Sequence, residues 1–370
     1  MVGDAFRPAI AGLVPYEPGK PVEEVQRELG LERVVKLASN EGQFGPFPAA
    51  VEALERGIPE LNRYPDSGAY RLVRALAEKH GVEPGNVAVG GGADAIINYL
   101  SMAALDPGEE MVCGWPSFPS YVLDALKMGA VPVRVPLTDH RYDAERILAA
   151  VTERTKIAYL CNPNNPTGTM IPREDVDAFL AGVPDHVLTV LDEAYFEYID
   201  HPDYPDGIEE HFKAGRRVLV LRTFSKIYGL AGLRVGYGVG PVEVVDAIKK
   251  MRNAFDVTQP AQDAALASLG DAAELERRRR VNAESRERLL ELCAALGLTV
   301  AEPAVANFLY VEVGGDSRAV FEALLREGVI VRPLGPFGAE DAVRVTVGTV
   351  EENEAFAEAF RRVAAPAARD

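Results

Sequence analysis

Cysteine and histidine are scarce in this chain, and their scarcity argues against two classes of protein. The three cysteines, Cys113, Cys161 and Cys293, are odd in number, widely separated and without CxxC spacing. We therefore expect buried, reduced thiols, as in a cytoplasmic protein, and no disulfide framework. The five histidines form no HxH or HxxxH pair, so the sequence predicts no metal site.

An excess of positive charge and a long apolar run are also absent. Lysine and arginine total 39 against 56 aspartates and glutamates, which gives a net charge of −17. This balance argues against binding to nucleic acid or to anionic membranes, because both need a basic face. No run of ~20 apolar residues occurs, and the N-terminal segment carries Asp4 and Arg7. We expect neither a membrane span nor a secretory signal, and a cytoplasmic location.

What is present is enough hydrophobic sequence for two domains. The chain has 370 residues, of which 48% are hydrophobic. Strand-like apolar runs alternate with amphipathic stretches such as 69–80 and 93–104, a pattern typical of an α/β domain with a largely parallel sheet. The expected strands are 87–90, 110–114, 131–135, 156–160, 187–191, 218–222 and 235–239.

The pattern changes near residues 253–260. We predict one long helix over about 261–296, and then a smaller α+β domain. The expected division is an N-terminal arm and helix over 1–35, a large domain over 36–252 and a small C-terminal domain over 253–370. In the small domain we expect strands at 307–313 and 343–347 and helices at 317–327 and 351–363.

Lys226, in the segment Thr223-Phe224-Ser225-Lys226, is the strongest candidate for chemistry. It follows a predicted strand, with hydroxyl groups beside it and Arg234 downstream. A lysine amine can form a Schiff base with the aldehyde of pyridoxal 5'-phosphate (PLP), while hydroxyls and an arginine hold the phosphate. We therefore predict Lys226 as the catalytic residue and Thr223, Ser225 and Arg234 as cofactor ligands.

Two polar segments, Asn162–Gly168 and Asp192–Tyr195, precede this lysine. Asp192 ends an apolar strand, where a carboxylate needs a partner. We expect it to keep the pyridine nitrogen of PLP protonated, with a helix cap as the alternative. Tyr195 and Asn165 are expected beside the 3'-oxygen of the ring. Simple packing for Tyr195 and an ordinary turn for Asn165 are the alternatives.

The glycine run Gly90-Gly91-Gly92 leads from a predicted strand into a predicted helix. The backbone amides of Ala93 and Asp94 would then point at the phosphate. A dinucleotide fold is the alternative, but the run lacks the full GxGxxG pattern. Phe118 is expected to stack on the pyridine ring, with an ordinary core aromatic as the alternative.

Together these segments resemble a PLP-dependent aminotransferase of fold type I, in the aspartate aminotransferase superfamily. Within it, the chain is similar to the histidinol-phosphate aminotransferases over nearly its whole length, through residues 15–20, 37–41, 328–332 and 344–349. The resemblance implies that Arg332 and Arg344 bind the acidic end of the substrate, with Tyr16 assisting and Asn40 in the same site. Two guanidinium groups suit a phosphate dianion. For Arg332 a surface salt bridge is the alternative.

Tyr64 adds an expectation about assembly. In this superfamily the matching tyrosine reaches the PLP phosphate of the neighbouring subunit, so the resemblance implies a homodimer with a shared active site. A turn tyrosine is the alternative. The chain departs from the usual pattern at three places. Gly42-Gln43 stands where Asn-Pro is common, Ala95 where an acidic residue is common, and Phe118 where tyrosine is more frequent.

The resemblance implies ping-pong transamination, with Lys226 as general base and acid. The expected reaction converts histidinol phosphate and 2-oxoglutarate to imidazole acetol phosphate and glutamate, in histidine biosynthesis. An aromatic amino acid aminotransferase is the alternative of the same class. A PLP-dependent decarboxylase or lyase fits less well, because two arginines for acid groups favour exchange between two substrates. A non-catalytic PLP-binding regulator would need a DNA-binding domain, for which residues 1–35 are too short and not basic enough.

Overall fold

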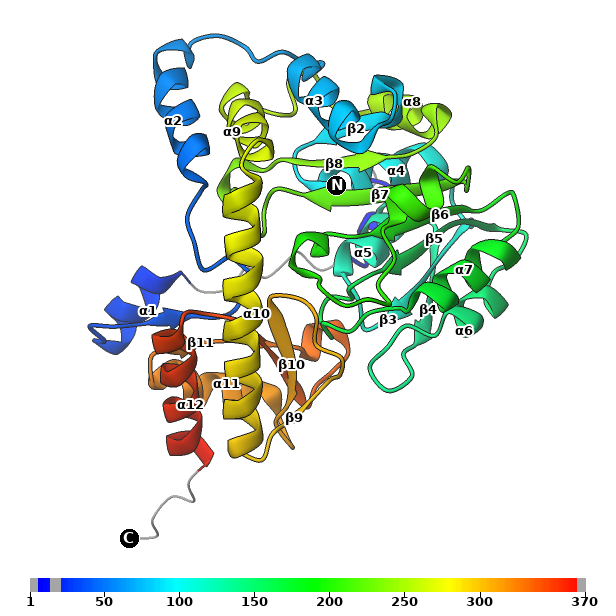
Figure 1. Cartoon of the computed structure of the whole chain (residues 1–370). Coiled ribbons are helices and arrows are strands. Elements are labelled where there is room, and N and C mark those ends of the chain that lie inside the picture. Colours follow the sequence, from blue (N-terminus) through cyan, green and yellow to red (C-terminus); the bar gives the residue numbers. More distant parts are fainter. Residues whose placement is uncertain (1–5, 14–20, 365–370) are drawn as a thin grey trace, which may run out of the picture.

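A computed structural model describes residues 6–13 and 21–364 of the chain. The larger part is an α/β arrangement around a seven-stranded sheet in the order β2-β8-β7-β6-β5-β3-β4 (Figure 1). All neighbouring strands are parallel except for β8, which is antiparallel to both β2 and β7. The strands are β2 (Val87–Gly90), β3 (Glu110–Trp115), β4 (Val131–Pro136), β5 (Thr155–Cys161), β6 (Leu188–Asp192), β7 (Val218–Thr223) and β8 (Gly236–Val239). The predicted mostly parallel sheet is confirmed.

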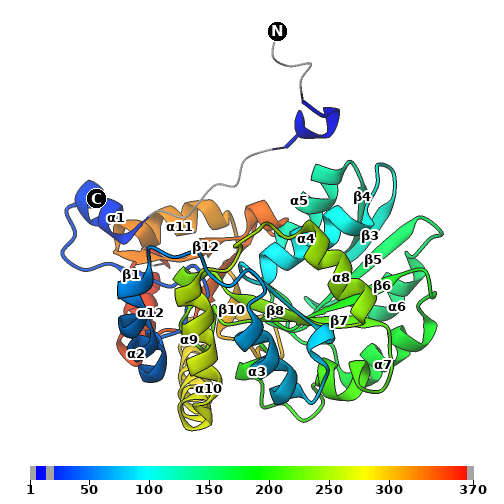
Figure 2. The same cartoon turned by 90° about the horizontal axis from the view of Figure 1, so that it is seen from above.

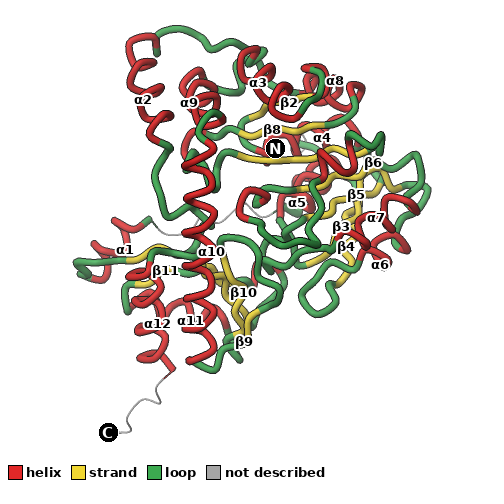
Figure 3. The backbone as a smooth tube through the Cα atoms, in the orientation of Figure 1, coloured by secondary structure: helices red, strands yellow, loops and turns green. Residues whose placement is uncertain are grey.

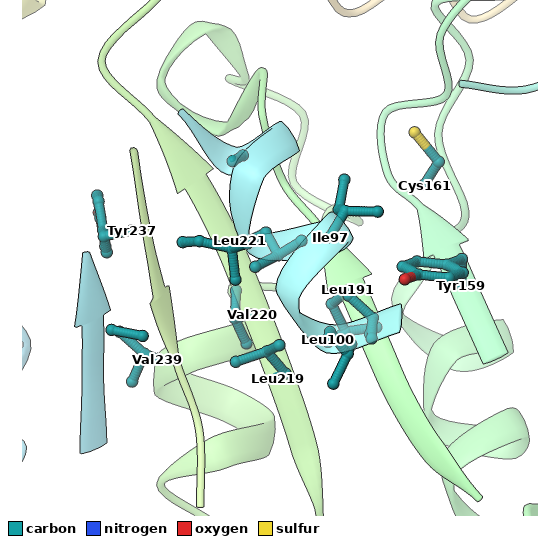
Figure 4. Packing of buried hydrophobic residues seen from close by; sticks show 14 of the residues in the cluster. Ile97, Leu100, Tyr159, Cys161, Leu191, Leu219, Val220, Leu221, Tyr237 and Val239 are labelled. Carbon is teal, nitrogen blue, oxygen red and sulfur yellow. The ribbon is translucent and has the colours of Figure 1, made fainter. Parts of the chain in front are cut away.

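Helices pack against this sheet because their apolar faces match its apolar strands. Figure 4 shows Ile97 and Leu100 of α4 (Ala93–Ala104) beside the strand β7, whose residues Leu219, Val220 and Leu221 are all buried. Burial of each such side chain contributes about 1.5–3 kcal/mol. The other helices of this part are α2 (Pro48–Gly57), α3 (Tyr70–His80), α5 (Pro119–Met128), α6 (Ala144–Ala149), α7 (Arg173–Gly182), α8 (Val242–Met251) and α9 (Gln259–Leu269).

A second, smaller body lies below this sheet in Figure 1 and is largely helix in Figure 3. Its antiparallel sheet has the order β12-β13-β10-β9 and carries its own hydrophobic cluster. The strands are β9 (Thr299–Val300), β10 (Phe308–Glu312), β12 (Arg332–Pro333) and β13 (Ala342–Thr346). The helices are α10 (Ala272–Ala295), α11 (Ser317–Arg326) and α12 (Val350–Ala364).

The N-terminal segment joins this smaller body although it is distant from it in sequence. Strand β1 (Val35–Lys36) pairs in parallel with β11 (Val329–Ile330). Val35 and Leu37 belong to the same hydrophobic cluster as Leu309 and Phe356. Helix α1 (Val22–Leu29) precedes this pair at the edge of the molecule, as the view from above shows (Figure 2).

The predicted single helix over 261–296 is wrong. Two helices, α9 and α10, are separated by Gly270 and Asp271, and the Asp271 side chain accepts a hydrogen bond from the amide of Glu274 at 3.0 Å. A glycine that ends one helix and an aspartate that caps the next explain the break.

Helix α9 packs in the larger cluster through Ala261, Ala264 and Ala265, whereas α10 reaches the smaller cluster through Leu289 and Cys293. The hydrophobic clusters therefore do not follow the predicted boundaries at 35/36 and 252/253. The division into domains stays a prediction, and the packing favours a boundary between α9 and α10.

The described residues include neither a membrane-spanning helix nor a cluster of metal ligands. Within residues 6–13 and 21–364, no helix combines the length and the apolar composition that a membrane span needs. The same part of the chain holds no group of three or more histidines, cysteines, aspartates or glutamates arranged to bind a metal. The three cysteines are buried and free.

Candidate active site

The carboxyl ends of the parallel strands bring the predicted site residues to one edge of the sheet. Strand β5 leads into Asn165, β6 ends at Asp192, and β7 leads into Lys226. In parallel sheets this edge is the usual place for a ligand, because the loops that follow neighbouring strands meet there. Segments far apart in the sequence thus supply one site.

Lys226 is held by a tight turn after β7. The amide of Gly229 donates to the Lys226 carbonyl at 3.0 Å. Gly229 has a φ of +70°, and a Cβ there would lie 2.3 Å from the Gly45 carbonyl oxygen, so the turn requires glycine. Gly42, one of the departures from the family pattern, also approaches closely, since its Cβ would lie 3.0 Å from the Lys226 carbonyl oxygen.

The Lys226 amine lies 5.4 Å from the centre of the Tyr195 ring. Burial, and next the nearby charge of Arg344, lower the pKa of Lys226 from 10.5 to about 8. A substantial fraction of this amine is therefore neutral near physiological pH. A neutral amine is the form that attacks a carbonyl or accepts a proton.

Asp192 is a buried carboxylate with a side chain held at both oxygens. Its residue exposure is 4%. The Tyr121 hydroxyl donates to Oδ2 at 2.5 Å, and the Ala194 amide donates to Oδ1 at 3.1 Å. Burial raises the pKa of Asp192 to about 6, against the lowering effect of these two donors. A buried carboxylate with this pKa is largely ionised at neutral pH, and it suits a cationic partner such as a protonated pyridine nitrogen.

Tyr195 and Asn165 both lie near the guanidinium of Arg344. The hydroxyl of Tyr195 accepts a hydrogen bond from Asn40 Nδ2 at 3.0 Å, and burial raises the pKa of Tyr195 to about 12. Asn165 Oδ1 accepts from Arg344 Nη1, while Arg344 Nη2 donates to the Ala38 carbonyl at 2.8 Å. A neutral phenol and an amide therefore stand next to a buried guanidinium.

An anion cradle is formed between β7 and the start of α4. Arg234 Nη1 lies 3.4 Å from the hydroxyl of Ser225, which accepts a hydrogen bond from Thr223 Oγ1 at 3.0 Å. Gly92, with φ of +93°, has no room for a Cβ, which would lie 2.7 Å from Arg234 Nη2. The guanidinium thus sits directly over the N-terminus of α4, where backbone amides favour an anion.

The other groups near this cradle differ in whether they can contact a bound anion. Gly236 brings β8 close to α4, since its Cβ would lie 2.4 Å from the amide nitrogen of Ala93. The Gly91 amide already donates to Asp256 Oδ2 at 2.8 Å, so this amide is engaged. The side chain of Asp94, in the first turn of α4, is exposed.

Arg332 and Arg344 are directly opposite each other in the pairing of β12 with β13. Their Cζ atoms lie 5.7 Å and 5.8 Å from the centre of the Phe337 ring. Like charges placed opposite each other in a sheet repel, and an aromatic face attracts both cations. Phe337 therefore offsets part of the cost of holding two guanidinium groups together.

Of three further predicted residues, the structure describes Tyr64 and Phe118. Tyr64 is 82% exposed and stacks on Phe255 with ring centroids 4.6 Å apart. Phe118 is half-buried between β3 and α5, with its ring 5.7 Å from that of Tyr121 in an edge contact. Tyr16 lies outside the described residues. The roles of all three stay predictions, as do those of the other site residues.

Two residues of the site, Tyr121 and Phe337, were not predicted from the sequence. Tyr121 follows Phe118 by one turn of α5, and that spacing was the available signal. Phe337 lies in a short 3-10 turn (Gly335–Phe337) that carries no periodic pattern.

The residues of this site fit PLP. The cradle that a Cβ at Gly92 would fill suits a phosphate, Asp192 offers a buried carboxylate, and Lys226 offers a partly neutral amine. The model of the family described as "Aminotransferase class I and II" matches residues 32–360. The chain belongs to this family, whose members are PLP-dependent aminotransferases that exchange an amino group between an amino donor and a keto acid.

Individual relatives match this chain over nearly its whole length. The histidinol-phosphate aminotransferase of Moorella thermoacetica is 46% identical over 97% of this chain and 93% of its own. Histidinol-phosphate aminotransferase 2 of Carboxydothermus hydrogenoformans is 44% identical over 96% of this chain and 98% of its own.

Solved structures agree with the fold. The histidinol-phosphate aminotransferase of Sinorhizobium meliloti, in complex with pyridoxal-5'-phosphate, has a TM-score of 0.88 at 32% identity over 97% of this chain and 98% of that chain. A double mutant of Thermus thermophilus aspartate aminotransferase has a TM-score of 0.85 at 28% identity over 97% and 99%.

Proposed function

We propose that this aminotransferase moves the amino group of histidinol phosphate to 2-oxoglutarate, in histidine biosynthesis. The observation that carries the proposal is the facing pair of Arg332 and Arg344, which share the Phe337 ring. A phosphate dianion can use two guanidinium groups, whereas one carboxylate is satisfied by one. The relatives from Moorella and Carboxydothermus, both histidinol-phosphate aminotransferases, support the same donor.

PLP would supply an electron-accepting ring that stabilises the charge left when the amino-bearing carbon of the donor loses a proton. Lys226 would carry this proton, first as general base and then as general acid. Asp192 holds the positive charge at the ring nitrogen. Tyr195 and Asn165 donate to the ring oxygen.

The remaining proposed ligands divide between phosphate and substrate. Thr223, Ser225, Arg234 and the amides of Ala93 and Asp94 bind the cofactor phosphate, and Phe118 covers the ring. Arg344 receives the acid group that both substrates have. Arg332 adds its charge for the phosphate of the donor, with Asn40 and Tyr16 beside them.

We further propose a cytoplasmic homodimer with Tyr64 reaching the partner's cofactor phosphate. Its support is the exposure of large apolar side chains on the segment that carries Tyr64 and on Phe255, which stacks on Tyr64. Ile58 is 61% exposed, Leu61 59%, Tyr64 82%, Tyr70 60% and Phe255 43%. Several large apolar side chains exposed on one segment favour a protein contact there. Sedimentation should give a dimer, and a change of Tyr64 to Phe should weaken PLP binding.

The substrate proposal is tested by comparing amino donors. Purified enzyme should be assayed with histidinol phosphate, phenylalanine and tyrosine against 2-oxoglutarate. We expect the highest kcat/KM with histidinol phosphate. A higher kcat/KM with phenylalanine would replace the proposal with an aromatic amino acid aminotransferase.

A further inference from the structure

Tyr121 makes a short hydrogen bond to Asp192 that none of the assigned roles uses. Its hydroxyl lies 2.5 Å from Asp192 Oδ2, and its side chain is 0% exposed. Its ring stacks on that of Tyr159, with centroids 4.2 Å apart and planes 12° apart. An edge contact with Phe118 closes another side of the ring. These two ring contacts and the hydrogen bond to Asp192 hold the hydroxyl in place.

The proton of this bond belongs to the phenol. Burial raises the pKa of Tyr121 well above its ordinary value of 10, and the nearby Asp192 charge raises it further. Tyr121 therefore donates and Asp192 accepts in its ionised form. A hydrogen bond to a charged acceptor is shorter and stronger than one between neutral groups.

The other groups that face Asp192 come from several elements and oppose each other. The carboxylate of Asp94, on α4, raises the pKa of Asp192, while the Ala194 amide and the charge of Lys226 lower it. The thiol of Cys161, on β5, stays neutral, because burial raises its pKa to about 12. Tyr121 is the largest of the contributions that favour the ionised carboxylate.

We infer that Tyr121 is a positioning residue that keeps Asp192 ionised and oriented toward the ring nitrogen of PLP. Each carboxylate oxygen has a second lone pair, so Asp192 can accept from Tyr121 and Ala194 and still face the cofactor. The inference rests on the proposed role of Asp192. It predicts that Tyr121 affects the cofactor only through that carboxylate.

The test is the affinity of the apoenzyme for PLP as a function of pH, measured with Tyr121→Phe. This change removes one oxygen and keeps the stacked ring. Tyr159→Phe is the matched control, because it removes a buried hydroxyl from the stacked neighbour. We expect the dissociation constant of PLP to rise roughly tenfold or more at pH 6 for Tyr121→Phe. The rise should shrink toward pH 9, where Asp192 is ionised in both proteins. Tyr159→Phe should bind PLP as the wild type does.

A double-mutant comparison separates this inference from the role of Asp192. In an Asp192→Asn background, Tyr121→Phe should change the PLP dissociation constant by less than about twofold, because the carboxylate is already gone. If the effect of Tyr121→Phe is the same at all pH values, or persists in full in that background, Tyr121 acts by packing and the inference is wrong. If Asp192→Asn itself leaves PLP binding unchanged, the proposed role of Asp192 is wrong, and the inference that rests on it is wrong as well.

Discussion

Burial shifts the two central ionisable residues toward neutrality from opposite sides. The pKa of Lys226 falls to about 8 and that of Asp192 rises to about 6, with desolvation as the largest cause for both. The sequence predicted both residues because strand ends and turn residues have local signals. It did not predict Tyr121, because its role depends on the packing of α5 across the sheet onto β6.

Lys226 should act as a base in its neutral form. With the pyridoxamine form of the enzyme and 2-oxoglutarate, where this amine is free, the rate should rise with pH through about 8 and then level off. Lys226→Ala should lower the rate roughly 10²-fold to 10⁴-fold or more. Borohydride reduction of the PLP enzyme and peptide mapping should label Lys226. A label on Lys156 or Lys249 would contradict the assignment.

Asp192 should make the apoenzyme less stable as pH rises. Its pKa is about 6 in the folded protein against an ordinary 3.8, so the folded state keeps a proton that the unfolded state releases between these values. The free energy of unfolding therefore falls as pH rises through this window, by up to about 3 kcal/mol. Asp192→Asn removes this effect.

Denaturant unfolding of both apoproteins at pH 4 and pH 7 measures this difference. Relative to the wild type, Asp192→Asn should gain stability between the two pH values. If the difference in unfolding free energy between the two proteins is the same at pH 4 and pH 7, the carboxylate is not desolvated in the apoenzyme.

At the scale of elements, most strands and helices were predictable because their periodic patterns are unbroken. The run Val218–Arg222 differs from β7 by one residue. The helix after residue 260 was predicted wrongly, because the cap at Asp271 interrupts a stretch that otherwise favours helix throughout. The close approach of β8 to α4 could not be predicted, because such a contact leaves no periodic pattern in the sequence.

Gly236 is where this close approach can be tested. An added Cβ would lie 2.4 Å from the Ala93 amide nitrogen and 2.8 Å from the Gly92 carbonyl carbon, both backbone atoms that cannot rotate away. Gly236→Ala should therefore displace the start of α4 and cost about 1–3 kcal/mol of stability. The same change should weaken binding of the PLP phosphate.

Gly232→Ala is the control, because nothing lies within 4 Å of its Cβ. Thermal unfolding and PLP titration should distinguish the two variants. If the two variants have the same stability and the same affinity for PLP, the start of α4 can move without loss of stability.

At the scale of the whole molecule, the site combines two bodies. The lysine and the anion cradle belong to the large sheet, whereas Arg332 and Arg344 come from the small one. Gly338, next to Phe337, packs against Trp115 at the end of β3, and its Cβ would lie 2.8 Å from Trp115 Nε1. Contacts of this kind join residues distant in the sequence, so the boundaries between the bodies could not be read from local patterns. The family resemblance nevertheless predicted both arginines as substrate ligands.

The most direct test of the proposed function is the single-turnover reaction of the PLP enzyme with amino donors, in wild type and Arg332→Ala. Loss of one charge-assisted, bidentate contact costs about 1.5–3 kcal/mol. We therefore expect Arg332→Ala to slow the reaction of histidinol phosphate by roughly tenfold or more at low concentration and to leave histidinol, which lacks the phosphate, and phenylalanine nearly unchanged. Arg344→Ala should slow histidinol phosphate and phenylalanine, which carry an acid group, and leave histidinol, which carries none, nearly unchanged. An unchanged reaction of histidinol phosphate in Arg332→Ala, or a wild type that prefers phenylalanine, would contradict the proposal.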